Sequence, residues 1–294
     1  MFRSILLTDS TNSNFFLMGL IVAFASTVLI LHRVSPPISG AYSIKKTTEA
    51  SLFNVLDKQA ASLVAEMTLE EKVGQMILPT IDFLAHSHGP ETIEKGKKGW
   101  TEETDLYKLG QLCGMEAISR LHIGAVLQAG NPIVFSGENQ DLPEWKKLSD
   151  MINLFYRGPK GTKILIGTDA VHGNQHVTGT ILFPHNIGLG ATHNPLLVEQ
   201  VAYWTMRNIS DSGFNWSYAP TVAIAHDYRW GRTYESFGSN PHLVKAFSLH
   251  YIKGLQQIEE NRISGVLATV KHFIGDGATA QGQDEGYTYA KDLK

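Results

Sequence analysis

The sequence predicts an α/β protein in which parallel strands alternate with helices, and we interpret the architecture as a (β/α)8 barrel of the TIM type. Helical segments separate short apolar runs that are typical of buried strands, at residues 123–127, 163–167, 214–218 and 265–269. This alternation indicates βαβ units and a parallel sheet. Polar residues follow the runs, and no early run leads into a G-x-G-x-x-G turn. Both observations favour a barrel over a dinucleotide-binding sheet.

The helices are predicted from apolar spacing and from residues that start or stop a helix. Thr68 and Glu71 form a capping box ahead of an apolar run, and Asn194 followed by Pro195 is a strong helix start. Gly213 is the matching stop signal. By these criteria, helices are expected at residues 54–67, 73–77, 101–121, 143–156, 194–212 and 241–260.

Composition restricts the class of protein. The chain has 294 residues, of which 43% are hydrophobic and 18% charged, which suits one large domain or two ordinary ones. The formal net charge of −3 gives no electrostatic reason to expect a nucleic acid partner. The single cysteine, Cys113, excludes an internal disulfide framework. We expect its side chain to be a small buried apolar group.

The first forty residues differ from the rest of the chain. An uncharged apolar run begins at Phe15 and ends at Leu31, and its length suits either a signal peptide or a membrane anchor. We therefore assign residues 1–41 to a signal peptide or anchor, with cleavage left open, and residues 42–294 to the folded domain. The expected location is the periplasm or the extracellular space, with membrane contact only through this run if it is not cleaved.

Side chains with catalytic or binding chemistry gather after two of the predicted strands. Asp169 and His172 follow the second strand, and Lys271 and His272 follow the fourth. Because the carboxyl ends of parallel strands meet at one rim, we expect these side chains to lie close together. A carboxylate, two imidazoles and an ammonium group are costly to gather unless a polar ligand binds there. The pattern therefore indicates a ligand site.

The residues after the third strand suit a sugar. Arg229 and Arg232 are interleaved with the aromatic residues Trp230 and Tyr234, and Trp216 lies in the strand itself. Each sugar hydroxyl both donates and accepts a hydrogen bond, and charged partners make the stronger bonds. The C–H face of a sugar ring favours an aromatic platform, and we expect these aromatic side chains to supply it.

These runs resemble the family 3 glycoside hydrolases, in particular their β-glucosidase and exo-β-glucanase branch. The resemblance covers roughly residue 63 to the end and rests on five ordered motifs, at residues 67–76, 169–173, 183–190, 229–236 and 270–277. It implies that Asp169, Arg232, Lys271 and His272 line the subsite for the non-reducing-end sugar, with Glu285 on the same rim. For His172 and Arg229 we favour a role in supporting the loops.

The resemblance also separates two branches of the family. Members that cleave N-acetylglucosamine carry a second histidine where this chain has Asp276, so the sequence is similar to the glucosidase branch. We expect no cofactor and no metal. His172 and His176 have a zinc-like spacing, but Gly173 and Gly179 argue against the helix that such a site needs.

The two carboxyl groups that a retaining glycosidase needs are not recognised in this sequence. In the family the nucleophile is an aspartate, typically followed by tryptophan, on a later strand, and the acid/base lies in a second domain. No Asp-Trp run occurs here, and only five or six of eight strands are counted. We therefore expect an incomplete barrel, with the nucleophile and acid/base beyond Lys294 and this chain alone inactive.

The sequence thus indicates the front part of an exported glycosidase. The expected reaction removes terminal β-D-glucosyl residues from β-glucosides or β-glucans by a retaining mechanism. Two alternatives stay open: a non-catalytic protein that keeps only the glucose subsite, and a membrane-anchored α/β protein whose polar rim binds another small ligand.

Overall fold

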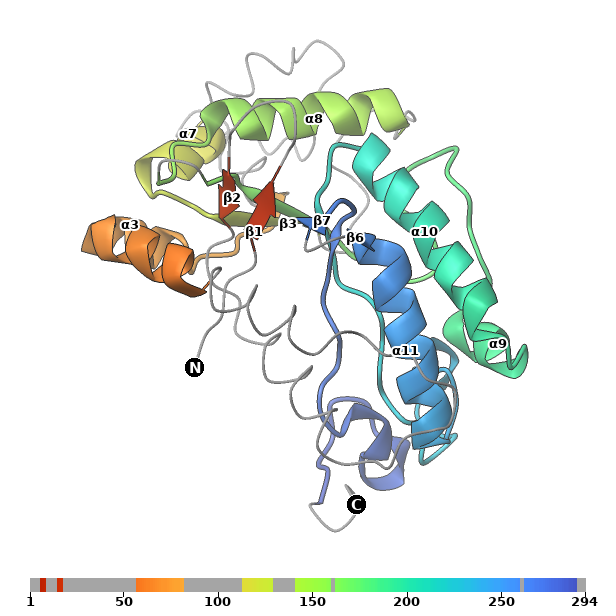
Figure 1. Ribbon diagram of the computed structural model, residues 1–294. Coiled ribbons are helices and arrows are strands. Elements are labelled where there is room, and N and C mark those ends of the chain that lie inside the picture. The colour runs from red at the N-terminus through yellow and green to blue at the C-terminus, as the bar shows by residue number, and fades with distance from the viewer. Residues whose placement is uncertain are drawn as a thin grey trace, which may run out of the picture. The chain divides into compact units, whose positions relative to one another are not determined.

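The computed structural model describes residues 6–8, 15–17, 57–81, 113–128, 141–159, 162–259 and 262–289 (Figure 1). The chain divides into two compact units. The first comprises residues 1–136, 147–166 and 258–264, and the second comprises residues 137–146, 167–257 and 265–294.

A capped helix in the first unit shows how local sequence sets the structure. Thr68 precedes α3 (Leu69–Gly74), and its Oγ1 accepts a hydrogen bond from the Glu71 N–H at 3.1 Å, while Glu71 Oε2 accepts one from the Thr68 N–H at 2.8 Å. The predicted capping box is therefore confirmed, but the helix starts and ends earlier than expected. After Gly74 the helical pattern stops, and the carbonyl of Gly74 accepts from the N–H groups of Ile77 and Gly124, each at 3.2 Å.

Four short parallel strands carry the fold. They are β3 (Ala125–Gln128), β4 (Leu165–Thr168), β5 (Trp216–Ser217) and β8 (Leu267–Ala268), in the order β3-β4-β5-β8. In the second unit Gly167 pairs with Trp216, which pairs with Leu267. The residues of β4, β5 and β8 are all buried, as expected for a parallel sheet covered on both faces. The α/β class is confirmed, with four parallel strands among the described residues against five or six expected in the whole chain.

The remaining helices and the turns connect these strands. In chain order they are α7 (Cys113–Arg120), α8 (Leu142–Phe155), α9 (Asn186–Ala191), α10 (Pro195–Asp211), η1 (Thr233–Glu235), α11 (Pro241–Gln256), η2 (Asp276–Ala278) and η3 (Ala280–Gly282). In addition, residues 57–66 are helical. Two antiparallel pairs complete the description, β1 (Leu6–Thr8) with β2 (Phe15–Leu17) and β6 (Ile258–Glu259) with β7 (Arg262–Ile263).

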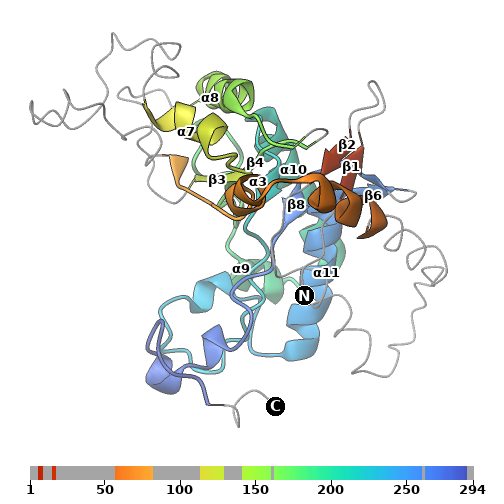
Figure 2. The same cartoon turned by 90° about the vertical axis from the view of Figure 1, so that its left-hand side faces the viewer.

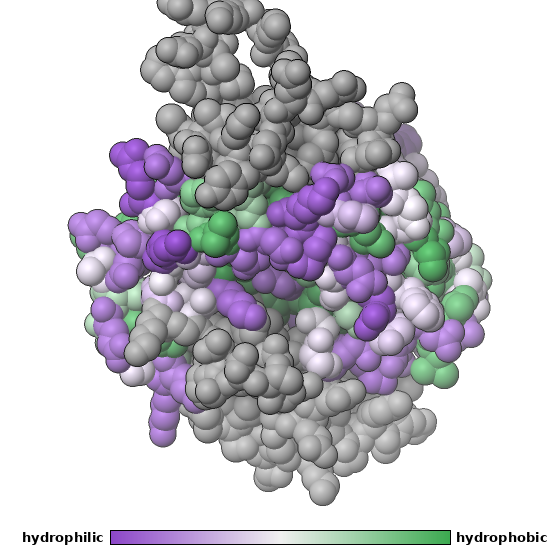
Figure 3. All heavy atoms as spheres, turned by 90° about the horizontal axis from the view of Figure 1, so that it is seen from above, coloured by the Kyte–Doolittle hydropathy of each residue, from purple (hydrophilic) through white to green (hydrophobic). Residues whose placement is uncertain are grey.

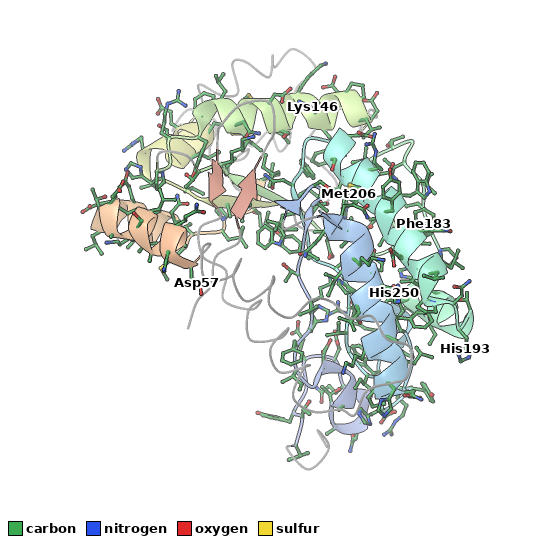
Figure 4. The ribbon with its side chains drawn as sticks, in the orientation of Figure 1. Asp57, Lys146, Phe183, His193, Met206 and His250 are labelled. Atoms are coloured by element: carbon green, nitrogen blue, oxygen red, sulfur yellow. The ribbon has the colours of Figure 1, made fainter. Side chains whose placement is uncertain are left out.

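Helices α10 and α11 pack side by side in the second unit (Figure 1 and Figure 2). Asn194 and Asn240 cap them, each through its side-chain oxygen, and a proline follows each cap. An ion-pair cluster also links the two helices, because Glu199 lies 2.8 Å from His250 Nδ1 and 2.6 Å from Lys253 Nζ. His250 is labelled in Figure 4. The predicted start and stop signals of α10 are thus confirmed.

The motif at residues 183–190 contains α9. The expected end of the helix at residues 241–260 was wrong. Helix α11 ends at Gln256, because Gln257 adopts a left-handed conformation (φ 44°) and the chain then enters β6. Trp204 is about half exposed, because the buried face of α10 is built by residues such as Val198 and Ile209. On the face drawn in Figure 3, hydrophobic side chains lie scattered among hydrophilic ones.

Several predictions fall outside the described residues. The apolar run of residues 15–31 is described only at Phe15–Leu17, which forms β2. In the described part of the chain, no helix has the length and apolar character to cross a membrane. Cys113 is the first residue of α7, but its side chain is not described.

Candidate functional site

The site begins with an ion pair at the carboxyl ends of β4 and β8. Asp169 directly follows β4, and Lys271 lies three residues after β8. Lys271 Nζ donates a hydrogen bond to Asp169 Oδ1 across 102 positions of sequence. The Lys271 side chain is 15% exposed and that of Asp169 is 37% exposed, so the pair is embedded but open to a ligand on the aspartate side. The rim position expected for both residues is the one observed.

The backbone fixes the place of Lys271. Its N–H donates to the carbonyl of Pro220 at 3.1 Å, and its carbonyl accepts from the N–H of Val222 at 2.6 Å. These bonds continue the parallel pairing of β5 and β8 past the ends of the strands. The lysine is therefore anchored as a part of the sheet edge.

Buried aromatic and polar groups surround the Asp169–Lys271 pair. Tyr218 follows β5, and burial, with the nearby charge of Asp169 as a second cause, raises the pKa of its phenol far above the ordinary value. Burial lowers the pKa of His176, and the charge of Asp169 opposes that shift. Gln175 donates its amide N–H to the backbone carbonyl of Asp169. Tyr218 and His176 are therefore neutral at pH 7.

A second charged pair lies in the turn after β5. Arg232 donates from Nε to Glu235 Oε1 at 2.6 Å and from Nη2 to Glu235 Oε2 at 2.9 Å. Asn186 at the start of α9 donates to the backbone carbonyl of Glu235 at 2.8 Å. The hydrogen bond to Glu235 raises the pKa of the guanidinium. Arg232 is thus a permanently charged group that a buried carboxylate holds in one orientation.

His272 connects the arginine to a third carboxylate. Its Nε2 lies 3.1 Å from Arg232 Nη2, and its Nδ1 lies 2.9 Å from Asp276 Oδ2. Burial lowers the pKa of His272, the charge of Arg232 lowers it further, and Asp276 opposes both. The imidazole is therefore neutral at pH 7. The side chains Asp276, His272, Arg232 and Glu235 form one connected chain.

Glu285 lies in the loop beyond this chain of contacts. It is exposed, has a positive φ of 56°, and lines a hollow of about 310 Å³ together with His272 and Asp276. The loop packs on the arginine turn, because Trp230 Nε1 donates to Asp284 Oδ1 at 2.9 Å. The structure therefore places Glu285 on the His272 side of the site.

The two residues expected to support loops make contacts of that kind. His172 Nδ1 lies 2.9 Å from the carbonyl of Phe183, and its ring stacks on His185 with centroids 3.9 Å apart. Arg229 pairs with Asp227 at 2.6 Å, and hydrogen bonds from Arg229 lower the pKa of that carboxyl to about 2. Neither geometry tests whether these residues touch a ligand, so their supporting role stays a prediction.

The aromatic platforms are not where the sequence suggested. Trp216 is 3% exposed and Trp230 is 1% exposed, so neither can offer a ring face to a sugar. Both indoles are buried because they find partners, Thr269 for Trp216 and Asp284 for Trp230. Tyr234 is partly exposed, with its ring edge against His185.

Sequence reasoning also missed members of the site. Glu235 lies within the motif at residues 229–236 and Asp276 distinguishes the family branch, but neither was predicted as a site residue. Their spacing was the available signal, because Glu235 follows Arg232 by three positions and Asp276 follows His272 by four. Phe273 was overlooked too, and it stands half exposed on the lining of the hollow. Within the described ranges, no group of three or more His, Cys, Asp or Glu residues could hold a metal ion.

Comparisons with known proteins agree with one another. The family model for the glycosyl hydrolase family 3 N terminal domain matches residues 68–293. The chain is 26% identical over 234 residues to the lysosomal beta glucosidase of Dictyostelium discoideum, covering 76% of this chain and 26% of that protein. It is 26% identical over 242 residues to the periplasmic beta-glucosidase/beta-xylosidase of Dickeya chrysanthemi, covering 80% and 34%.

A solved structure extends the comparison. The exo-1,3/1,4-beta-glucanase from a Pseudoalteromonas species superposes with a TM-score of 0.62 at 33% identity, covering 84% of this chain and 28% of that one. The chain therefore spans between a quarter and about a third of the length of these relatives.

Proposed function

This chain belongs to glycosyl hydrolase family 3, and from that premise we propose that its strand-end side chains bind the terminal, non-reducing β-D-glucosyl unit of a β-glucoside or β-glucan. The observation that carries the proposal is the Asp169–Lys271 ion pair at one rim, with Arg232 and His272 in the same compact unit. The relatives named above include β-glucosidases and an exo-glucanase, which supports a glycosidase as the whole protein.

The proposed chemistry of binding follows from donor and acceptor counts. Asp169 uses Oδ1 for Lys271, which leaves Oδ2 to accept a sugar hydroxyl, and Lys271 has two further N–H groups to donate. Among the described residues, Arg232 donates from Nε and Nη2 to Glu235 and from Nη2 to His272. Its Nη1 can therefore donate to a sugar hydroxyl. Vicinal hydroxyls that each donate and accept match this set, and charged partners strengthen the bonds.

The bond-breaking step is assigned to groups outside this set. Retaining hydrolysis needs two carboxyl groups about 5 Å apart, one as nucleophile and one as acid/base. Asp169, Glu235 and Asp276 lie against Lys271, Arg232 and His272, and the chain spans only a quarter to about a third of the length of its relatives. We therefore propose that the nucleophile and acid/base lie elsewhere in the full-length protein, and that Asp169 binds substrate.

The proposal assigns a glucoside rather than a xyloside as the substrate, and this assignment can be tested. One relative is named both a beta-glucosidase and a beta-xylosidase, and the two sugars differ only in the hydroxymethyl group on C5. Comparing kcat/KM for an aryl β-glucoside and the matching aryl β-xyloside in the full-length protein decides between them. A xyloside preference would overturn the glucosyl assignment and leave the sugar-binding rim intact.

The test of the rim is Asp169→Asn in the full-length protein. The substitution keeps the shape but weakens charge-assisted bonds, so kcat/KM on the preferred aryl glycoside should fall by about 10- to 150-fold, equivalent to roughly 1.5–3 kcal/mol. The control is Asp211→Asn, at the exposed end of α10, which should leave kcat/KM unchanged. An unchanged value for Asp169→Asn would remove this residue from the site. Sugar binding without turnover in the wild-type protein would instead establish a non-catalytic sugar-binding protein.

We also propose that the protein is exported. The apolar run of residues 15–31 supports this, as do relatives named periplasmic and lysosomal. Cell fractionation locates the protein, and mass spectrometry of its mature N-terminus shows whether the leader is removed. Recovery of the intact chain in the cytosol would contradict the proposal.

A further inference from the structure

The loop after Lys271 returns a carboxylate to His272. Gly275 adopts a left-handed conformation (φ 99°), and the chain turns so that Asp276 Oδ2 lies 2.9 Å from His272 Nδ1. The turn is held from both sides, because the carbonyl of Gly277 accepts from His226 N–H at 2.9 Å and that of Gly275 accepts from Thr288 Oγ1 at 2.8 Å. Asp276 is only 15% exposed. The imidazole and the carboxylate are thus placed close together by a fixed backbone. Their contact is electrostatic, because Nδ1 and Oδ2 are close but do not form an aligned hydrogen bond.

The partners of His272 determine which ring nitrogen carries the proton. Arginine has donors only, so His272 Nε2, which lies 3.1 Å from Arg232 Nη2, has to accept. In a neutral imidazole the proton then belongs on Nδ1, the nitrogen that faces Asp276. With the proton on Nε2, two donors would oppose each other at 3.1 Å, and Nδ1 would oppose a carboxylate with no proton between them.

The charges around the ring are balanced in a way that keeps it neutral. Burial disfavours protonation of the ring, and so do the charges of Arg232 and Lys271. The charges of Asp276 and Glu235 favour protonation. A neutral ring has two tautomers, so a specific partner is needed to select one. Free imidazole side chains populate both forms. Arg232, held by Glu235, faces Nε2, and Asp276 faces Nδ1 from the other side of the ring.

We propose that Asp276 is a positioning residue that holds the proton of His272 on Nδ1. Nε2 then stays an acceptor for Arg232, and the guanidinium is fixed between His272 on one side and Glu235 on the other, with Nη1 left for the sugar. The kinetic consequence rests on the proposed function, whereas the tautomer is a property of the protein alone. Asp276 acts through His272 and touches no ligand in this scheme.

The direct test measures the tautomer without any substrate. Histidine labelled with ¹³C and ¹⁵N is incorporated into the full-length protein, the signal of His272 is assigned by its loss in His272→Gln, and the ring shifts report which nitrogen is protonated. We expect the Nδ1–H form in the wild-type protein at pH 7. Asp276→Ala should show a measurable fraction of Nε2–H, and Asp276→Asn less, because the amide oxygen keeps a partial negative charge that can face Nδ1. Glu285→Gln, which removes another carboxylate from the lining of the same hollow, should leave the wild-type tautomer.

A kinetic cycle tests the consequence. On an aryl β-glucoside, Asp276→Ala should lower kcat/KM about ten-fold. This is roughly the contribution of the one hydrogen bond between Arg232 and His272 that depends on the tautomer. In the His272→Gln background, the same change should have no further effect, because the residue through which Asp276 acts is gone.

The outcomes separate the two proposals. Absence of glycosidase activity in the wild-type protein would overturn the proposed function and leave the tautomer measurement intact. A pure Nδ1–H signal in Asp276→Ala, or an Nε2–H signal in the wild type, would overturn the positioning role even in an active enzyme. If the alanine variant does not fold, the wild-type and asparagine spectra still decide, since an Nε2–H wild type contradicts the proposal.

Discussion

Replacing Glu235 by glutamine should reveal how strongly the site depends on the carboxylate that holds Arg232. The two hydrogen bonds measure 2.6 and 2.9 Å, Glu235 is 9% exposed and Arg232 is 29% exposed. Glutamine keeps one acceptor oxygen but places an amide N–H₂ against a guanidinium N–H. One charge-assisted bond is lost, and the other becomes a bond between a charged and a neutral group.

The expected cost follows from these losses. A hydrogen bond to a charged group contributes about 1.5–3 kcal/mol, and the partial exposure of Arg232 lets water replace part of it. We therefore expect Glu235→Gln to lower the free energy of unfolding by about 2 kcal/mol, measured by urea denaturation of the full-length protein with an unchanged m-value. The affinity for the sugar should fall as well, because Arg232 loses its fixed orientation.

A matched control shows whether the loss of stability in Glu235→Gln is specific to this buried carboxylate or follows from neutralising any carboxylate beside an arginine. Asp227→Asn breaks the comparable pair with Arg229, whose side chain is 70% exposed against 29% for Arg232, and pairs open to solvent contribute little. We expect no measurable change in the midpoint of its unfolding. Equal midpoints for Glu235→Gln and the wild type would refute the reasoning, as would a loss in Asp227→Asn as large as that in Glu235→Gln.

Three further predictions concern stability. Thr68→Ala removes one half of the capping box of α3 and should cost about 1 kcal/mol in urea denaturation; an unchanged midpoint would show that the cap is redundant. Gly190→Ala would bring a Cβ within 1.9 Å of the Phe237 carbonyl, whereas Gly231→Ala meets nothing within 4 Å, so the first should lose about 1–3 kcal/mol and the second should melt like the wild type. The pKa values of His176, His185 and His272 are lowered, in each case chiefly by burial. The unfolded chain therefore binds protons first on acidification, and the stability these groups contribute is present above their ordinary pKa of about 6.5 and is lost as the pH falls below it. The midpoint of urea unfolding should therefore be higher at pH 7.5 than at pH 5.5. His185→Gln should reduce this difference between the two midpoints, and a higher midpoint at pH 5.5 would contradict the prediction.

Local signals made most of the helices and strands predictable. Asn194, Pro195 and Gly213 define α10 within one residue at each end, because capping and stop residues act on their own turn. Each of the four apolar runs overlaps an observed strand, and β3 and β4 extend one residue past the predicted runs. Trp204 could have been placed on the exposed face of α10 from helical spacing alone.

What could not be predicted depends on distant partners. Helix α11 ends at Gln257 in a left-handed conformation, for which the sequence offers no glycine. Trp230 is buried because its N–H reaches Asp284, 54 positions away, and an exposed platform and a buried indole look the same in sequence. Around the site, the rim position of Asp169 and Lys271 followed from strand order. The roles of Glu235 and Asp276 depend on how two turns direct their side chains.

The ion pairs around the rim have a consequence for how a ligand approaches. Asp169, Glu235 and Asp276 are formally negative and Lys271 and Arg232 positive, and each cation contacts an anion. The two cation–anion pairs largely cancel beyond a few ångströms, but Asp276 faces a neutral imidazole, so these five charged groups together carry a net charge of −1. An uncharged sugar feels no net force from this charge, so its association should change little with ionic strength. A sugar acid is repelled from the rim, so the charge favours uncharged sugars, and the geometry of their hydroxyl groups selects among them at contact.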